Sequence, residues 1–335
     1  MIWEPRAYET GDLREVAALG VGSVKLWLAY VELGIMAEDD VALAVLQEAA
    51  ELGVVALAHC ENGRAVDLLT RQLVAAGRLG LDSLPRSRPI ELEAECVHRF
   101  LALAEVAGAT PYVVHVTGAR PLEEIATARA RGQTVYAEVC AHHLRFQREQ
   151  HEGPDGLRYV MTPPLRTAAD RAALMRGLRD GSLDTYASDH CHLRLDRDKL
   201  PVAGDFTQVP TGVPGIGARL PLGFAQAVDG EAPLSPERLV AVTCANPARI
   251  FGLYPQKGVI APGSDADIVI WDPSRPSRIT LEALQDGLDW SPYDGIDVPG
   301  TIRDVFARGD RVVADGAFAG EGHRGAYLPV DRVRQ

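Results

Sequence analysis

The sequence predicts an α/β protein in which parallel strands form part of a (β/α)8 TIM-like barrel, followed by a small β unit near the C-terminus. Two observations support this fold class. Short apolar runs alternate with amphipathic helical patterns through the first two thirds of the 335 residues, which is typical of a parallel sheet covered by helices. After Asp189 the alternation stops, and a stretch rich in glycine and proline leads into short strand patterns.

Five apolar runs are expected to be parallel strands, because each is short and bounded by helical or turn signals. A closed barrel needs eight strands, so the sequence predicts an incomplete barrel with about strands 4–8 present and with the missing strands upstream of Met1. The expected strands are Val24–Leu28, Val54–Ala58, Tyr112–Val116, Thr134–Cys140 and Thr185–Ser188. The helical patterns are Asp39–Leu52, Glu91–Ala107, Pro121–Ala130 and Thr167–Arg179.

The last third of the chain follows a different pattern. Residues 190–234 are expected to form one long ordered loop, and loops of that length are usually functional. A helix is predicted at Pro236–Cys244. Short strands with turn signals follow it. These strands are Asp267–Trp271, Val305–Arg308 and Arg311–Ala314. We therefore expect residues 1–250 to form the partial barrel and residues 251–335 to form the C-terminal β segment and tail.

Composition excludes several classes of partner. The net charge of −12 argues against nucleic acid and anionic membrane surfaces, because both would repel the protein. No apolar run approaches the roughly 20 residues that span a bilayer. The five cysteines are odd in number and have no CxxC spacing, so reduced thiols and a cytoplasmic location are expected.

Four polar residues stand at or inside the ends of the expected strands, where barrel enzymes place their active sites. They are Lys25, His59, His115 and Asp189. A lone histidine there is more often structural, and a lone aspartate is often a turn cap. Lys25 is harder to dismiss, because a buried amine tends to lose its proton and become nucleophilic. Such an amine can take up carbon dioxide, and the resulting carbamate can bridge two metal ions. Together the four residues predict a site for Zn²⁺, with Mn²⁺ as the second choice.

Several motifs resemble the hydantoinase/dihydropyrimidinase family of metal-dependent amidohydrolases in order and spacing. The resemblance extends over nearly the whole chain, and its pattern of spaced motifs is specific. The motifs in the barrel region are Lys25–Tyr30, His59–Gly63, Val114–Thr117, Glu138–Cys140, Thr162–Arg166 and Ser188–Cys191, and those in the tail are Asn246–Leu253 and Gly263–Val269. The tail is similar to the family's return into a β-sandwich, so a small C-terminal β-sandwich portion is implied.

The resemblance implies a role for each candidate residue. Lys25 would be carboxylated and would bridge two divalent metal ions, with His59 and His115 on the second ion. Asp189 would bind the first ion and shuttle a proton while a metal-bridging hydroxide opens the ring of a cyclic amide, such as a 5-substituted hydantoin or a dihydropyrimidine. Tyr30 would donate a hydrogen bond to the oxyanion. Substrate contacts would come from Tyr30, Thr162 and Thr211, although relatives commonly have Ser and Asn at the two threonine positions.

One part of the family pattern is absent. Relatives bind the first metal ion through a His-x-His pair on the first barrel strand, and this chain has that spacing only at His190 and His192, which follow the last expected strand. We therefore expect a truncated sequence whose upstream part supplies the pair, and we expect residues 1–335 alone to be inactive.

Three alternatives stay open at this point. Allantoinase and dihydroorotase are alternatives within the same class, and a non-catalytic scaffold or inactive fragment is the alternative from another class. A homotetramer or homodimer is expected for the full-length protein, with a small cyclic ureide or imide as its substrate. His142 and His143 are expected to support the site indirectly or to lie in a loop, and His151 is expected at the surface.

Overall fold

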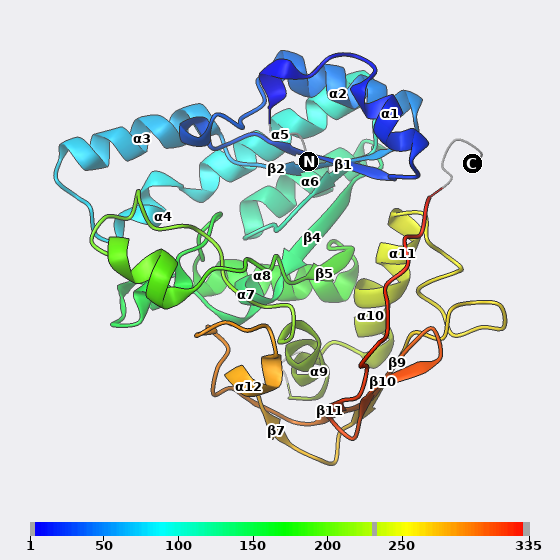
Figure 1. The fold of residues 1–335 in the computed structure, drawn as a ribbon. Helices are drawn as coiled ribbons and strands as arrows, with labels where there is room; N and C mark the ends of the chain where they lie inside the picture. Colours follow the sequence, from blue (N-terminus) through cyan, green and yellow to red (C-terminus); the bar gives the residue numbers. More distant parts are fainter. Residues whose placement is uncertain (1–3, 230–232, 331–335) are drawn as a thin grey trace.

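The computed structural model describes residues 4–229 and 233–330, so Met1 lies outside the described residues. Its centre is a parallel sheet of five strands in the order β1-β2-β3-β4-β5 (Figure 1). The strands are β1 (Ser23–Trp27), β2 (Val55–His59), β3 (Pro111–Val113), β4 (Tyr136–Cys140) and β5 (Thr185–Ala187). The five predicted strands and the α/β class are confirmed, whereas continuation of this sheet into a barrel stays a prediction.

The two faces of the sheet differ in chemistry, because successive side chains of a strand point to opposite faces. Lys25 on β1 pairs in register with Leu57 on β2, and Leu57 pairs with Tyr112 on β3. The alternate positions belong to the main hydrophobic core and carry small or aliphatic side chains: Val24, Leu26, Ala56, Ala58, Val113, Ala137 and Val139. Lys25 and His59 therefore share the face that points away from the main core.

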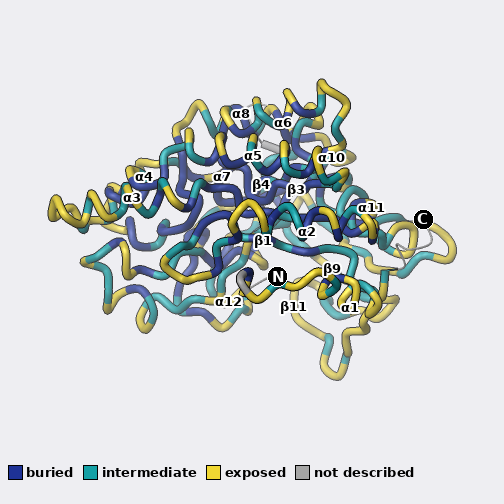
Figure 2. The backbone as a smooth tube through the Cα atoms, turned by 90° about the horizontal axis from the view of Figure 1, so that it is seen from above, coloured by how far each residue is buried: buried dark blue, intermediate teal, exposed yellow. Residues whose placement is uncertain are grey.

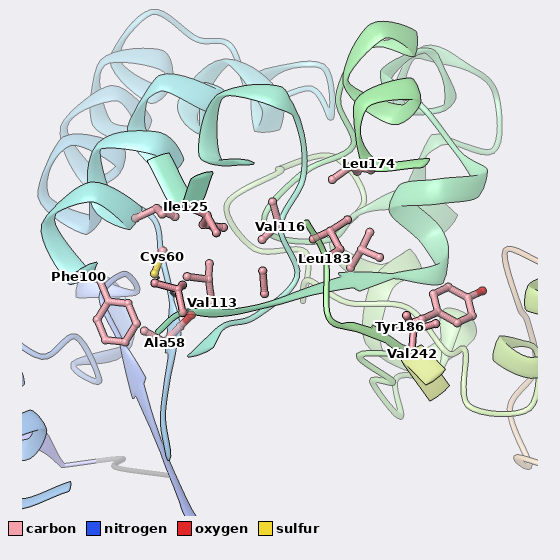
Figure 3. Close-up of a cluster of buried hydrophobic side chains, with 14 of the residues drawn as sticks. Ala58, Cys60, Phe100, Val113, Val116, Ile125, Leu174, Leu183, Tyr186 and Val242 are labelled. Atoms are coloured by element: carbon pink, nitrogen blue, oxygen red, sulfur yellow. Dashed lines mark hydrogen bonds between the residues drawn. The ribbon is translucent and has the colours of Figure 1, made fainter. Parts of the chain in front are cut away.

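Four helices cover the core face and confirm the predicted helical patterns to within two residues. They are α2 (Asp39–Glu51), α5 (Ile90–Ala107), α6 (Ala119–Ala130) and α8 (Ala168–Asp180). Figure 3 shows Phe100, Ile125 and Leu174 from these helices directed at the core face of the strands. Phe100 is fully buried, and burial of one such side chain contributes about 1.5–3 kcal/mol to folding. Accordingly, the segments coloured as buried in Figure 2 run through the middle of the molecule.

Several helices were not predicted. They are α1 (Asp12–Ala18), α3 (Gly63–Ala75), α4 (Ser83–Ser87), α7 (Ala141–Arg145), α9 (Arg219–Asp229) and α12 (Leu281–Leu284). The prediction of one long loop over residues 190–234 is therefore wrong where α9 lies. The loop was predicted from the glycine and proline content of this stretch, but Pro221 lies in the first turn of α9, where a backbone donor is not required. Gly223 lies so close to Leu239 that an added Cβ would be 2.8 Å from Leu239 Cδ1, so glycine here serves helix packing.

The predicted helix at Pro236–Cys244 is divided in the structure. It consists of α10 (Pro236–Val240), a one-turn π-helix (Ala241–Ala245) and α11 (Asn246–Ile250). The end of this segment returns to the sheet, where Ile250 forms a small buried cluster with Val55, Tyr112 and Val114. These apolar side chains thereby close part of the sheet face that carries Lys25 and His59.

The C-terminal part forms an antiparallel sheet of four strands in the order β11-β10-β9-β6. These are β6 (Ile268–Asp272), β9 (Thr301–Ala307), β10 (Asp310–Ala314) and β11 (Ala317–Phe318), and a separate pair is formed by β7 (Ser277–Arg278) and β8 (Asp297–Val298). The three predicted C-terminal strands are confirmed, and the β-sandwich stays a prediction. Trp271 stacks on Phe224 of α9 with 4.2 Å between ring centroids, so this sheet packs against the larger α/β part.

The last described residues of the chain return to the segment that precedes β1. The Val330 backbone N–H donates to the Gly20 carbonyl at 2.8 Å, and the Tyr327 hydroxyl donates to the Leu19 carbonyl. All five cysteines are free thiols. Of the helices in the described parts of the chain, none is both long and apolar enough to cross a membrane.

Candidate active site

The carboxyl ends of the five parallel strands border one cavity with a volume of about 190 Å³. It is lined by each of the residues that the sequence predicted for metal binding, catalysis and substrate contact, together with apolar side chains. The lining residues are Lys25, Trp27, Tyr30, Leu33, Ile35, His59, His115, His142, Met161, Thr162, Asp189, Cys191, Thr211, Gly212 and Val213. Residues that lie far apart in the sequence are thus brought together by strand ends, as in other parallel α/β proteins.

Three of the predicted residues have a backbone conformation that is uncommon for residues other than glycine. The φ angles are 68° at Tyr30, 38° at His115 and 42° at Asp189. Left-handed backbone outside glycine is uncommon and costs free energy, and it persists where the surrounding structure enforces it, often at functional sites. Each of these residues follows a strand closely, so the sharp bend directs its side chain into the cavity.

His59 is held by a buried carboxylate. Its Nε2 lies 2.7 Å from Glu61 Oε2, and the same oxygen accepts a hydrogen bond from Arg88 Nη1 at 2.6 Å. All three side chains are buried. Burial opposes ionisation of Glu61, but the Arg88 guanidinium and the His59 ring outweigh it and lower the pKa of Glu61 to about 2. Glu61 is therefore an anion that fixes one ring nitrogen of His59.

The other ring nitrogen of His59 is free to bind a metal ion. Nδ1 is buried and has no hydrogen-bond partner among the described residues. The His115 ring is also buried, with its centroid 4.6 Å from that of His59. Burial lowers the pKa of both histidines, so both rings are neutral and offer lone pairs. A carboxylate on one nitrogen with a vacant second nitrogen is the usual setting of a metal-binding histidine, and the donor set fits a divalent cation.

Lys25 and Asp189 are the more accessible of the four predicted metal ligands. Lys25 is half-buried, because β1 is an outer strand of the described sheet, and its Nζ lies 4.3 Å above the centroid of the Trp27 ring. The expectation of a buried amine is therefore corrected to a half-buried one. Asp189 is exposed, although it lines the same cavity. Both side chains can reach a ligand in the cavity without crossing the core.

The residues predicted to contact substrate form a chain of hydrogen bonds. The hydroxyl oxygens of Tyr30 and Thr162 are 2.7 Å apart, and the Thr162 hydroxyl donates to that of Thr211 at 2.9 Å. Burial raises the pKa of Tyr30, so its phenol stays protonated. The Arg88 guanidinium carbon lies 5.4 Å from the centroid of the Tyr30 ring, which links this chain to the Glu61 ion pair.

Lys199 was not predicted as part of the site. It is fully buried, and its Nζ donates to the backbone carbonyls of Val160 at 2.9 Å and of Gly212 at 2.8 Å. Burial lowers the pKa of Lys199 to about 7. Because Gly212 lines the cavity and Val160 is next to Met161, which also does, Lys199 ties together two wall segments that carry the threonines.

Two expectations about other histidines are corrected. His151 is buried, and not at the surface, because the turn that contains it packs inward; burial lowers its pKa to about 4. For His142 and His143 only the loop alternative is wrong, because both lie on α7; His142 lines the cavity. Within the described residues, one group of histidine, cysteine and carboxylate side chains has ligand atoms within 4.8 Å of one another, and it consists of Cys140, His142 and His143.

Comparisons with known proteins agree with this geometry. Residues 30–312 match the Amidohydrolase family. The chain is 37% identical to a D-hydantoinase of Ralstonia pickettii over 100% of this chain and 73% of the relative. It is 39% identical to a D-hydantoinase of Streptomyces coelicolor over 92% of this chain and 66% of the relative. The chain therefore spans only part of the length of these relatives.

Solved structures give the same result. A D-hydantoinase (dihydropyrimidinase) from Thermus sp. superposes with a TM-score of 0.93 at 34% identity, covering 97% of this chain and 71% of the other. A dihydropyrimidinase from Brevibacillus agri superposes with a TM-score of 0.89 at 36% identity, covering 93% and 68%. The chain belongs to the amidohydrolase family, as a cyclic amidohydrolase of the hydantoinase and dihydropyrimidinase group.

Proposed function

We propose that the protein opens the ring of a cyclic ureide, such as a 5-substituted hydantoin or a dihydropyrimidine, by hydrolysis of a ring amide with two Zn²⁺ ions. The observation that supports this most directly is the single cavity shared by Lys25, His59, His115 and Asp189. Membership of the amidohydrolase family implies divalent metal ions. Zn²⁺ is proposed because neutral imidazoles and oxygen anions are its common ligands.

In this proposal carboxylated Lys25, His59 and His115 would hold one ion, and the Lys25 carbamate and Asp189 would hold the other. The vacant His59 Nδ1 and the adjacent His115 ring support the first assignment. The ion at Asp189 has fewer protein ligands than a tight Zn²⁺ site requires, and the sequence has no His-x-His pair before Lys25. Full activity is therefore expected only when that ion gains further ligands.

When bound, the ions would lower the pKa of a water molecule that they hold and would polarise the substrate carbonyl. The protein's own groups would do the rest. Asp189 would accept a proton from the attacking water and transfer it to the ring nitrogen as the C–N bond breaks. Tyr30, kept protonated by burial, would donate a hydrogen bond to the carbonyl oxygen as it becomes negative. Thr162 and Thr211 would position the ring through the chain of hydrogen bonds that they form with Tyr30.

The test compares substrates and chain lengths. The chain, and the same chain joined to the part of a D-hydantoinase relative that it does not cover, are loaded with Zn²⁺ and bicarbonate, and ring opening of 5-substituted hydantoins, dihydrouracil, allantoin and dihydroorotate is measured. The extended form is expected to prefer the first two substrates and to exceed the short form clearly in turnover. Preference for allantoin or dihydroorotate would contradict the proposed substrate class, and metal-independent turnover would contradict the mechanism.

Tyr30→Phe in the active form is expected to lower kcat by roughly 10²–10³, because loss of one oxyanion donor has that effect in other hydrolytic enzymes. The KM should change little, since the hydrogen bond strengthens only in the transition state. Tyr327→Phe is a matched control, because Tyr327 is exposed and its hydroxyl contacts only the Leu19 carbonyl in the described structure. An unchanged kcat in Tyr30→Phe would remove Tyr30 from the mechanism.

A further inference from the structure

A cluster of potential metal ligands lies at the junction of β4 and α7, apart from the four residues assigned above. Cys140 is the last residue of β4, and His142 and His143 lie in the first turn of α7. All three side chains are buried, with exposed fractions of 0%, 2% and 3%. One ligand atom from each lies within 4.8 Å of the other two. Because the ligand atoms of a tetrahedral Zn²⁺ site lie about 3–4 Å apart, given Zn–S and Zn–N distances of about 2.3 and 2.0–2.1 Å, only small side-chain movements would be needed.

The hydrogen bonds of His143 prepare it as a ligand. Its Nε2 lies 3.2 Å from the Pro163 carbonyl oxygen, which can only accept, so this nitrogen carries the proton. Nδ1 therefore has a lone pair, and it is buried with no hydrogen-bond partner in the described chain. A backbone carbonyl that fixes the tautomer and leaves the second nitrogen vacant is the typical arrangement for a metal-binding imidazole.

His142 provides the second vacant nitrogen. Its Nδ1 is likewise buried without a hydrogen-bond partner among residues 4–229 and 233–330. The two rings are edge-to-face, with centroids 4.3 Å apart, and burial lowers the pKa of His142 to about 3, so this ring is neutral. Buried polar atoms without partners are rare in native proteins, and an ion is one of the usual reasons for them. Two neighbouring imidazole rings that each have a vacant nitrogen, beside a buried thiol, indicate a cation.

The ligand types select the cation. Thiolate is a soft ligand that Zn²⁺ and other soft ions prefer, and imidazole also suits Zn²⁺. One sulfur and two nitrogens give three protein ligands, which leaves the fourth tetrahedral position for water. His142 lines the cavity, so the cluster has an entry path from solvent. The site predicted around Lys25 has no thiol ligand, which makes the two sites chemically distinguishable.

We propose that Cys140, His142 and His143 form an additional Zn²⁺ site in the wall of the active-site cavity. On binding, the Cys140 thiol loses its proton to solvent and both histidines bind as neutral rings, so one proton is released per ion. The bound cation narrows the cavity and adds positive charge beside the reaction centre. Excess Zn²⁺ therefore inhibits ring opening, and this last consequence alone rests on the proposed function.

The test uses Cd²⁺, which reports thiolate binding through its ultraviolet charge-transfer band. Metal-free chain is titrated with Cd²⁺, and absorbance and proton release are recorded together. We expect the band to saturate with one proton released per thiolate-bound ion, and we expect it to disappear in Cys140→Ser. Cys191→Ser is the matched control, since Cys191 lines the same cavity, and Cys60→Ser is a second control at a thiol that is as buried as that of Cys140. Both controls should keep the band.

Two further variants test the histidines and the independence of the site. His142→Gln should weaken Cd²⁺ binding at least tenfold, in line with the roughly 10–100-fold cost of losing even an outer partner of a metal site. Lys25→Ala should keep the Cd²⁺ band, because the loss of the Lys25 amine affects only the two ions proposed at the Lys25 site. Circular dichroism checks that each variant is folded; if Cys140→Ser is not, the His142→Gln result decides. A band that survives in Cys140→Ser, or affinity unchanged in folded His142→Gln, would overturn the proposal.

The inhibitory consequence has a separate measurement. In the active form, ring opening should fall as Zn²⁺ is raised beyond the amount that gives full activity, and His142→Gln should shift this inhibition to at least tenfold higher Zn²⁺. Absence of any hydrolysis would contradict the proposed function and leave the Cd²⁺ result standing as evidence for the site. Inhibition that is identical in His142→Gln would contradict the inhibitory role of the site.

Discussion

Lys25→Ala is expected to abolish ring opening and to remove at least one Zn²⁺ per chain. An alanine cannot form the carbamate that is proposed to bridge the ions, and His59 and His115 alone are too few ligands for tight binding. The metal content, measured after dialysis, should fall even in a form of the chain that is otherwise inactive. The intact mass of the metal-loaded parent under native conditions should exceed the sequence mass and the metal by one carbon dioxide, and the variant should lack this addition.

The role of Lys25 is separated from a general effect of charge by two comparisons. Lys25→Arg keeps the positive charge beside Trp27 but has no amine that takes up carbon dioxide, so it should fail as completely as Lys25→Ala. Small carboxylates such as acetate or propionate should restore part of the metal binding in Lys25→Ala, because they supply a bridging anion. Full metal content in Lys25→Ala without added carboxylate would exclude a bridging carbamate.

The strands and the four polar residues at their ends could be predicted because both leave a local signal. Each strand is a short apolar run, and Lys25, His59, His115 and Asp189 interrupt or follow one of these runs. Parallel strands with helical connections place their carboxyl ends at one edge of a sheet. One cavity shared by the four side chains is thus a consequence of topology, which the sequence pattern already contains.

The supporting residues could not be predicted, because their roles depend on contacts distant in sequence. Arg88 is an ordinary arginine until the fold places it 2.6 Å from Glu61. Lys199 ends a run of charged residues that is typical of a solvated surface, yet a π-helical turn directs its Nζ to two backbone carbonyls. The His-x-Glu spacing of His59 and Glu61 was the one available signal, since side chains two residues apart near a strand end can lie on the same side.

The short helix α7 shows why local propensity fails at such sites. It has five residues and no side-chain cap hydrogen bond, so none of the usual start signals marks it. It is stable because Ala141 and Leu144 pack into the main core. The same packing buries His142 and His143, which a pattern of neighbouring polar residues would place in solvent.

Glu61→Gln is expected to be the most destabilising conservative change near the site. It leaves the buried Arg88 guanidinium without its buried anion, since the other carboxylate near Arg88, that of Glu32, is exposed and 4.0 Å away. Loss of one partner of a buried ion pair typically costs about 3–5 kcal/mol. Glu38→Gln is the matched control, because Glu38 pairs with Arg64 at the surface with both side chains at least half exposed; less than about 1 kcal/mol is expected there. Urea unfolding of both variants at neutral pH measures the difference, and equal losses would contradict a structural role for the pair.

The same ion pair predicts a pH dependence whose sign follows from the pKa of Glu61. The folded-state pKa is about 2 and lies below the ordinary glutamate value of about 4.3. The unfolded chain therefore binds more protons between these values, so the stabilisation is fully present above about pH 4.3 and is lost as the pH falls toward 2. Glu61→Gln has no such group, so the difference in unfolding free energy between the parent and the variant should shrink over this window.

Glu61→Gln should also bind Zn²⁺ roughly 10–100-fold more weakly, because Glu61 fixes the His59 ring that is proposed to hold the ion. Metal affinity is compared at neutral pH in urea-free buffer, where the variant is checked to be folded; unchanged affinity would show that His59 is oriented without Glu61 or does not bind the ion.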